Sequence, residues 1–239
     1  MPYQSLTAVN TEELYGLFDT VAMTAWTEVP DMDLENAGLA DSGTSVFLAY
    51  DAEQEQGKPG QPNPTESKII LIGKEDGAGN YYVAVDGADK VFTADKEMID
   101  AVLNVEPYQY ILKIPTLVSL KAVDEVWITG TEKEHVLRQE EDGCTIDGKD
   151  AKKEDFQKCY ASLMDITVTG ELPGDAEPEE EREAVLTICF DRKDDDAPDV
   201  EIKYYPYDET QMSACINGQE RLLVDGDSVK TLKESLDRE

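Results

Sequence analysis

Histidine is nearly absent from the sequence, and this scarcity excludes the common forms of nucleophilic catalysis. His135 is the single histidine among the 239 residues. Ser–His–Asp and Cys–His catalysis both place a histidine base beside the nucleophile, so both would depend on this one side chain. It lies next to Val136 and Leu137 in a predicted strand, where a histidine usually packs or faces solvent. GxSxG and Gly-rich phosphate-binding motifs are also missing, so we expect no catalytic residue, no cofactor and no enzymatic activity.

Basic residues are scarce as well. The chain has 21 Lys and Arg against 53 Asp and Glu, which gives a formal net charge of -32. Proteins bind DNA or RNA through clustered Lys and Arg that displace counterions, and no such cluster occurs in this sequence. Repulsion from anionic headgroups disfavours direct binding to a membrane surface in the same way. We therefore expect no nucleic-acid partner and interpret most of the acidic residues as solvated surface.

The four cysteines, Cys144, Cys159, Cys189 and Cys215, show no CxxC spacing. This absence excludes the usual zinc knuckles and redox motifs, so free thiols are the expected state. Cys189 and Cys215 fall in strands that are predicted below for one sheet. A disulfide between these two residues therefore stays open as an alternative.

Long apolar runs are missing too. No stretch of eighteen apolar residues occurs, and the first twenty residues lack the basic start and apolar centre of a signal peptide, so the sequence predicts a soluble chain. A chain of 239 residues is long enough to bury a core without metal or disulfide support. Patterned apolar segments recur along it, and they exclude disorder throughout.

Those segments predict both helices and strands. Thr11–Trp26 has acidic residues at its start and an apolar stripe at helical spacing, so we interpret it as a helix. Further helices are predicted over 96–103, 150–165 and 227–236. Short runs rich in β-branched and aromatic residues predict strands, namely 46–50, 68–72, 81–85, 91–93, 126–129, 135–139, 144–146, 186–190, 200–205, 212–216 and 222–224.

The two ends of the chain repeat one order of elements: helix, strand, loop, three strands and helix. Ser45–Asp51 aligns with Val185–Asp191 at a spacing of 140 positions. Tyr81–Gly87 aligns with Met212–Gly218 at a spacing of 131 positions. Because the same order recurs with turn signals at matching places, the sequence predicts an internal duplication.

This repeat sets the expected fold class and domain boundaries. The sequence predicts an α+β protein with two repeated antiparallel β-meander modules, each packed with helices. A duplicated module suits a scaffold or a binding role better than it suits one catalytic centre. The expected boundaries are 1–104 for the first module, 105–150 for a connecting strand-rich segment and 151–239 for the second module.

Tyrosines gather at equivalent places in the two predicted modules. Strand residues alternate between the two faces of a sheet, so about half of these rings should point outward. Exposed tyrosines often anchor protein interfaces, and ordinary packing within the sheet is the alternative. The candidate binding residues on such a sheet face are Tyr81, Tyr82, Tyr204, Tyr205 and Tyr207.

Acidic clusters raise two further alternatives. Asp194, Asp195 and Asp196 are weak candidates for a calcium site, because calcium prefers oxygen ligands but the spacing of an EF-hand is missing. We predict no dedicated metal site and favour solvated turns. A carboxylate-dependent hydrolase would need two acids with separated pKa values in one cleft, and among 53 acidic residues some pair always looks suitable.

Short structural motifs recur in both halves of the chain: Gly38-Leu39, Val46–Tyr50, Ile69–Gly73, Tyr81-Tyr82-Val83, Asp86-Gly87 and Val91-Phe92 in the first, and Leu186–Phe190, Tyr205–Asp208 and Asn217-Gly218 in the second. Together with the apolar link from Tyr110 to Ile128, they resemble the bacterial family known as domain of unknown function 4340, over about residues 12–236. Because the motifs are structural, the resemblance bears on fold rather than on activity.

The resemblance implies a protein held on the outer face of the bacterial cytoplasmic membrane by an N-terminal anchor, and some relatives accompany ABC-type transport systems. This chain departs from that pattern, because its first residues carry no anchor. We expect a non-enzymatic extracytoplasmic interaction or accessory module, linked to transport or to the cell envelope, with a protein partner. The alternatives are the carboxylate-dependent hydrolase and a calcium-stabilised surface protein.

Overall fold

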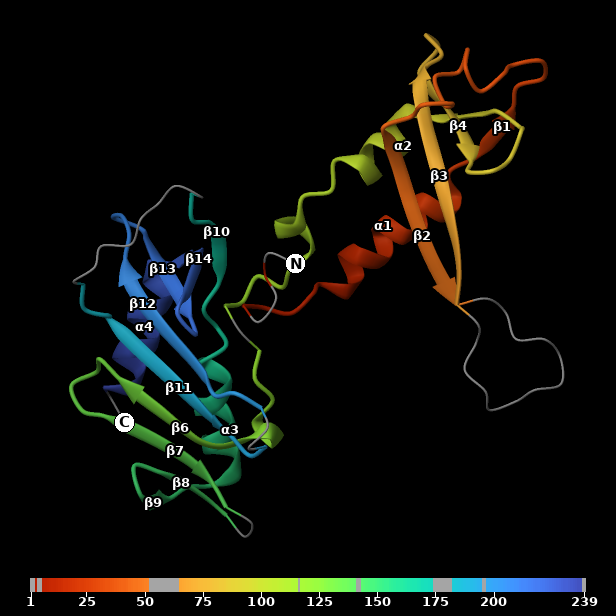
Figure 1. Cartoon of the computed structure of the whole chain (residues 1–239). Helices are drawn as coiled ribbons and strands as arrows, with labels where there is room; N and C mark the ends of the chain where they lie inside the picture. Colours follow the sequence, from red (N-terminus) through yellow and green to blue (C-terminus); the bar gives the residue numbers. More distant parts are fainter. Residues whose placement is uncertain are drawn as a thin grey trace, which may run out of the picture. The chain divides into compact units, whose positions relative to one another are not determined.

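The chain folds into a mixed α+β structure with two antiparallel sheets and four α-helices in the part that is described (Figure 1). The computed structural model describes residues 3, 6–51, 65–115, 117–140, 143–173, 182–194 and 197–237. These residues form two compact units. Thr11–Gln109 forms one, which we call the inserted unit, and Met1–Asn10 together with Tyr110–Glu239 forms the other, which we call the main unit.

This division differs from the predicted boundaries at both ends of the first module. The Asn10 N–H donates to the carbonyl oxygen of Tyr110 at 2.8 Å, and the Leu112 N–H donates to that of Ala8 at 2.8 Å. The segment before Thr11 therefore belongs to the main unit rather than to a module spanning 1–104. The predicted connecting segment 105–150 supplies strands to the main sheet and is no separate body.

The inserted unit holds a five-stranded antiparallel sheet in the order β1-β5-β4-β3-β2. Because the order runs this way, the first strand of the unit pairs with its last. The η1 turn (Pro107–Tyr110) leads back toward the main unit. The elements of the inserted unit are α1 (Thr11–Met23), β1 (Trp26–Glu28), β2 (Thr44–Asp51), β3 (Thr65–Glu75), β4 (Asn80–Val85), β5 (Phe92–Asp95) and α2 (Lys96–Leu103).

Apolar clusters cover both faces of this smaller sheet. On one face Ile99 of α2 packs with Val83 and Ala94. On the other face Ala37 and Leu39, from the loop before β2, join a separate cluster with neighbours from the sheet. Burial of both clusters stabilises the unit through the hydrophobic effect.

The main unit holds a nine-stranded antiparallel sheet in the order β10-β14-β13-β12-β11-β6-β7-β8-β9. Figure 1 shows α3 and α4 on one side of this sheet. The elements are η2 (Leu120–Ala122), β6 (Val123–Thr129), β7 (His135–Gln139), β8 (Cys144–Ile146), β9 (Lys149–Asp150), α3 (Lys153–Ser162), β10 (Val168–Glu171), β11 (Leu186–Arg192), β12 (Val200–Pro206), β13 (Gln211–Ile216), β14 (Gln219–Asp225) and α4 (Gly226–Leu236).

The core of the main unit lies between the sheet and its two helices. Alternate residues of β11 and β12, including Phe190 and Tyr204, are fully buried there. The ring of Phe190 meets that of Tyr160 from α3 edge to face, with 6.0 Å between their centroids. The Tyr160 hydroxyl also donates to the carbonyl oxygen of Val118 at 2.9 Å. A buried tyrosine with its hydroxyl hydrogen-bonded fixes α3 against the sheet.

Alkaline pH should unfold the main unit through its buried tyrosines. Burial raises the pKa of Tyr160 to about 12, although the positive charge of Arg192 lowers it by a smaller amount. Burial also raises the pKa of Tyr204. The unfolded chain releases these protons near pH 10. Above that pH the folded state binds more protons than the unfolded state, so stability falls as pH rises. The expected loss is about 1.4 kcal/mol per pH unit for each of the two tyrosines.

A spectroscopic titration checks this pH dependence. Tyrosinate absorbance and far-UV circular dichroism should be followed together above pH 9. The last tyrosines of the 11 in the chain should ionise only as the circular dichroism signal is lost. Ionisation of every tyrosine near pH 10 with the circular dichroism unchanged would contradict the burial of these two hydroxyls.

Candidate functional site

The two candidate tyrosines of the inserted unit do not share a surface. The Tyr81 hydroxyl donates to Asp100 Oδ1 at 3.0 Å, and the Lys96 ammonium lies 5.1 Å from the centre of its ring. Tyr82 packs instead against the apolar cluster beneath the loop before β2. Adjacent strand residues point to opposite faces, which explains the separation.

The three candidate tyrosines of the main unit differ in exposure. Tyr204 is 1% exposed and lies in the core, so its ring cannot contact a partner. Tyr205 is half-buried, and the guanidinium of Arg182 lies 4.1 Å from the centre of its ring. Tyr207 is 44% exposed and follows the end of β12. Only Tyr205 and Tyr207 of this set are accessible in the main unit.

Trp127 marks the centre of the sheet surface opposite α3 and α4, which we call the open face. Its neighbours on β6, Val126 and Ile128, are buried, so Trp127 points away from the helices and is 44% exposed. Cross-strand pairing sets it between Val136 of β7 and Cys189 of β11. Trp127 was not among the predicted binding residues. The alternation of β6 sets it on the face opposite Val126 and Ile128 but does not say which of the two faces the helices cover.

Ion pairs lie on either side of this apolar centre. Arg138 Nη2 lies 2.6 Å from Glu125 Oε1, and Lys203 Nζ lies 2.6 Å from Glu201 Oε1. The hydrogen bond with Glu201 raises the pKa of the Lys203 ammonium. The open face thus places an exposed indole among charged side chains.

Cys189 and Cys215 lie on the same open face but are not bonded to each other. All four cysteines are free thiols. β12 separates the strands of Cys189 and Cys215, so about 10 Å divides their positions, whereas a disulfide needs Cα atoms within about 7 Å. Burial raises the pKa of both thiols, and the carboxylate of Glu201 raises that of Cys189 further. The disulfide alternative is therefore wrong.

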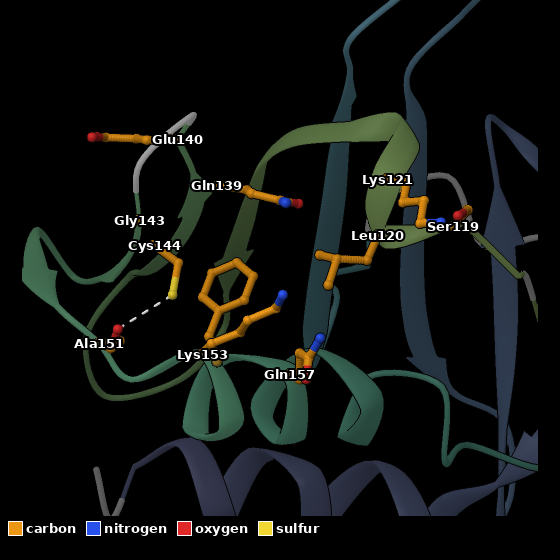
Figure 2. Close-up of a pocket in the computed structure, with 11 residues that line it drawn as sticks. Ser119, Leu120, Lys121, Gln139, Glu140, Gly143, Cys144, Ala151, Lys153 and Gln157 are labelled. Carbon is orange, nitrogen blue, oxygen red and sulfur yellow. Dashed lines mark hydrogen bonds between the residues drawn. The ribbon is translucent and has the colours of Figure 1, made fainter.

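A pocket of about 710 Å³ with both polar and apolar lining residues opens beside α3 in the main unit (Figure 2). Gln139 and Leu120 reach into it from opposite sides, and Lys153 extends into it from α3, as Figure 2 shows. The Cys144 thiol donates to the carbonyl oxygen of Ala151 at 3.3 Å. The lining residues are Ser119, Leu120, Lys121, Gln139, Glu140, Gly143, Cys144, Ala151, Lys153, Phe156 and Gln157.

The chemistry of this pocket suits a small polar or anionic molecule better than acid–base hydrolysis. Lys121 and Lys153 line it without an ion pair to any residue in the described ranges. The side-chain oxygen of Gln139 is buried there without a hydrogen-bond donor from the described residues. Among the described residues of the lining, Glu140 carries the one carboxyl group, whereas a carboxylate-dependent hydrolase uses two.

His135 occupies a structural position at the start of β7. It is 2% exposed, and its Nδ1 lies 3.0 Å from Asp147 Oδ2. The Val136 N–H donates to Asp147 Oδ1 at 3.0 Å, and Lys133 Nζ lies 3.2 Å from Asp147 Oδ2. Burial raises the pKa of Asp147, but these hydrogen bonds outweigh burial and leave the pKa lowered. The arrangement ties β7 to the turn before β9, where Asp147 has a φ of 52°.

The acidic candidates for calcium do not form a site among the described residues. Asp194 is exposed, while Asp195 and Asp196 lie outside the described residues. Across the described ranges no group of three or more His, Cys, Asp or Glu side chains is arranged to hold a metal ion. Several aspartates with lowered pKa serve turns or helix caps instead, as Asp225 does by accepting from the Ser228 N–H at 2.8 Å.

No family model, characterised protein or solved structure matches the chain. None of the helices in the described part has the length and apolar character needed to span a bilayer.

Proposed function

We propose that the protein is a non-enzymatic interaction or accessory module that binds a partner protein through the open face of its main unit. Trp127 carries this proposal, because it is a large aromatic side chain, 44% exposed, at the centre of a broad sheet surface. Ordinary packing would place such a side chain inward. Tryptophan is strongly enriched among the residues that dominate protein–protein binding.

The surroundings of Trp127 support the same role. Val136 and Cys189 extend the apolar centre on both sides. The pairs Arg138–Glu125 and Lys203–Glu201 form a polar rim around it. An apolar anchor inside a polar rim is the usual anatomy of a specific interface, since the rim excludes water from the centre once the partner is bound.

The resemblance described above supports an extracytoplasmic location and a link to transport or the cell envelope. In this proposal the chain works beside a membrane without touching its lipids. The net charge of -32 fits such a role, because it keeps the protein away from anionic headgroups. A basic or neutral partner would meet less repulsion than an acidic one.

We also propose that the chain contains one module twice, the second copy being the part of the main unit from α3 to α4. The strand order β1-β5-β4-β3-β2 and the order β10-β14-β13-β12-β11 follow one scheme. In each set a helix precedes the first strand and another follows the last. Five strands can be ordered in many ways, so a shared order supports duplication.

Matching hydrogen bonds at the turns give further support. The Asp86 N–H donates to the carbonyl oxygen of Ile69, and the Asn217 N–H donates to that of Glu201, both at 2.9 Å. Each donor directly follows the fourth strand of its set, and each acceptor lies in the third strand. A duplicated sheet offers two surfaces for binding, which suits an accessory module.

Substitution of Trp127 by alanine tests the proposed function. We expect the partner captured by the wild-type protein from a gentle membrane extract to bind at least about 30-fold more weakly, as for loss of a residue worth about 2 kcal/mol. Tyr15→Ala is the control, because it removes an aromatic ring that is 65% exposed but belongs to the inserted unit and not to the open face. Recovery of no partner, or equal weakening by both variants, would count against the open face as the binding surface.

A further inference from the structure

The outer edge of β2 is open and carries none of the usual protections of an edge strand. Within the described ranges β2 pairs only with β3, over eight residues and without a register shift. It holds no proline, and Asp51 at its end is its single charged residue. Proteins usually shorten, charge or bulge such edges, because unpaired N–H and C=O groups recruit other strands.

The other sheet edges in the described structure are protected. β1 has three residues and β9 has two, both of them charged. β10 has four residues and a register shift between Val168 and Gly170. The long regular edge of β2 is therefore an exception that selection for solubility would normally remove.

The corresponding strand of the main unit has a neighbour at this position. β2 pairs with β3, and β11 pairs with β12, in corresponding places of the two sheets. The pair Val46–Ile70 in the first sheet corresponds to the pair Ile188–Ile202 in the second. The far edge of β11 is taken by β6, which pairs with it antiparallel. This comparison rests on the proposed duplication, whereas the open edge of β2 does not.

A small apolar groove lies between the sheet and the helices α1 and α2 of the inserted unit, and it extends to β2. It measures about 140 Å³ and includes Val46 and Leu48 of β2 in its lining. No described residue of α1 is buried, and Phe18 and Met23 on this helix are 54% and 75% exposed. In the main unit Val126 and Ile128 of β6, the strand beside β11, are buried.

We propose that the outer edge of β2 binds an extended, basic segment of a partner protein as an added antiparallel strand. Main-chain hydrogen bonds along β2 would supply affinity, and alternate apolar side chains of the segment would enter the groove beside Leu48. The segment lies on β2 as β6 lies on β11.

Charge selects a basic segment over a second copy of this chain. Two copies would each bring a net charge of -32 to the contact. Asp51 ends the strand, and Glu66 lies opposite Tyr50 across the hairpin, where it accepts a hydrogen bond from the hydroxyl at 3.0 Å. Lys68 is the one basic residue paired with β2, and its ammonium lies 5.9 Å from the centre of the Tyr50 ring.

A synthetic peptide with a sequence derived from β6 tests this proposal on the full chain. The probe is a labelled peptide of residues 121–130 with Asp124→Lys and Glu125→Lys, which keeps the apolar alternation of β6 and makes the segment basic. We expect saturable binding in fluorescence anisotropy. Amide hydrogen exchange within residues 44–51 should slow at least about tenfold when the peptide is bound, because added ladder hydrogen bonds protect exposed N–H groups.

Matched controls separate edge pairing from charge attraction. The same peptide with Ile128→Pro loses a ladder donor and should bind at least tenfold more weakly. The unsubstituted acidic peptide should also bind at least tenfold more weakly. Leu48→Lys in the protein should abolish binding, and Ala49→Lys serves if that variant fails to fold, because Ala49 is exposed. The protein variant Thr27→Lys, which is changed on the opposite edge of the same sheet, should bind the basic peptide as tightly as the wild type does.

Three results would overturn the proposal. Equal binding of the acidic peptide would remove the requirement for a basic partner. Binding without protection of residues 44–51, or binding unaffected by both edge variants, would place the peptide elsewhere. A dimer in sedimentation that Ala49→Lys dissociates, without peptide binding, would make a second copy the occupant. Peptide binding and capture through Trp127 are measured separately, so failure of either leaves the other standing.

Discussion

Replacing Phe190 by alanine should lower the free energy of unfolding of the main unit by about 3–5 kcal/mol. Phe190 is 0% exposed at the centre of β11, and its ring packs edge to face on that of Tyr160. The substitution removes buried apolar surface and leaves a cavity, which the strands on both sides cannot collapse to fill. The aromatic contact adds about 0.5–1.5 kcal/mol to this loss.

Urea denaturation followed by tryptophan fluorescence measures the effect of Phe190→Ala. The chain has 2 tryptophans, so a Trp26→Phe background leaves Trp127 as the reporter of the main unit. Tyr207→Ala is the control, because it also removes an aromatic ring but from a side chain that is 44% exposed. It should change stability by less than about 0.5 kcal/mol. A similar loss in both variants would contradict the buried position of Phe190.

Replacing Gly130 by alanine should destabilise the main unit by about 2–5 kcal/mol, because two costs add at this turn. Gly130 has a φ of +97°, which side chains of L residues rarely adopt. An added Cβ would also lie 2.5 Å from the carbonyl oxygen of Val185 and 3.0 Å from Leu186 Cα. Both neighbours are backbone atoms at the start of β11, so they can move only if the strand moves.

Gly148→Ala isolates the conformational part of that cost. Gly148 has a φ of +73°, yet an added Cβ there would meet nothing within 4 Å. We therefore expect a loss of about 1–2 kcal/mol from backbone strain alone. Thermal unfolding of both variants gives the comparison. Equal destabilisation would mean that the close approach of Val185 to Gly130 contributes nothing to the stability of the turn.

Local pattern was enough to predict most elements of this fold. The predicted strand 81–85 and helix 96–103 lie within one residue of β4 (Asn80–Val85) and α2 (Lys96–Leu103). These segments carry strong periodicity and clear start signals, as in the capping of α2 by Asp95. The mixed α+β class is confirmed for the same reason.

Tertiary pairing overrides the local pattern at the shortest strands. The predicted helix 11–26 ends at Met23, because Trp26 pairs with Ala94 in β1 and takes an extended conformation. β10 was not predicted either, since its residues are held by β14 rather than by their own propensity. Strands of three or four residues carry too little periodicity to be recognised alone.

The predicted alignment of the two copies shows how little local sequence says about register. The sequence repeat aligns Ser45–Asp51 with Val185–Asp191, and it therefore aligns Val46 with Leu186. Under the proposed duplication, the pairing of each strand with its neighbour instead makes Ile188 the counterpart of Val46. A shift by two residues keeps every side chain on its face, so alternation cannot reveal it.

The candidate site was harder to predict than the fold. The tyrosine-rich strands predicted both Tyr204 and Tyr205 as binding residues, but only Tyr205 is accessible, whereas Tyr204 is buried. Trp127 was missed because its outward direction depends on which face of β6 the helices α3 and α4 cover. That choice is made by contacts between residues far apart in the sequence. The pocket beside α3 is lined by residues of η2, β7, β8 and α3, so it depends on the same kind of long-range contact.

The hydrogen bonds between Asn10 and Tyr110 and between Ala8 and Leu112 carry a consequence for how the chain can be altered. The backbone leaves the main unit and re-enters it at adjacent points, so excision of residues 11–109 would leave a gap that a tight loop can close. Every strand of the nine-stranded sheet would remain. The two units can therefore be exchanged or lost separately during evolution, and each can acquire a new binding partner without remodelling the other.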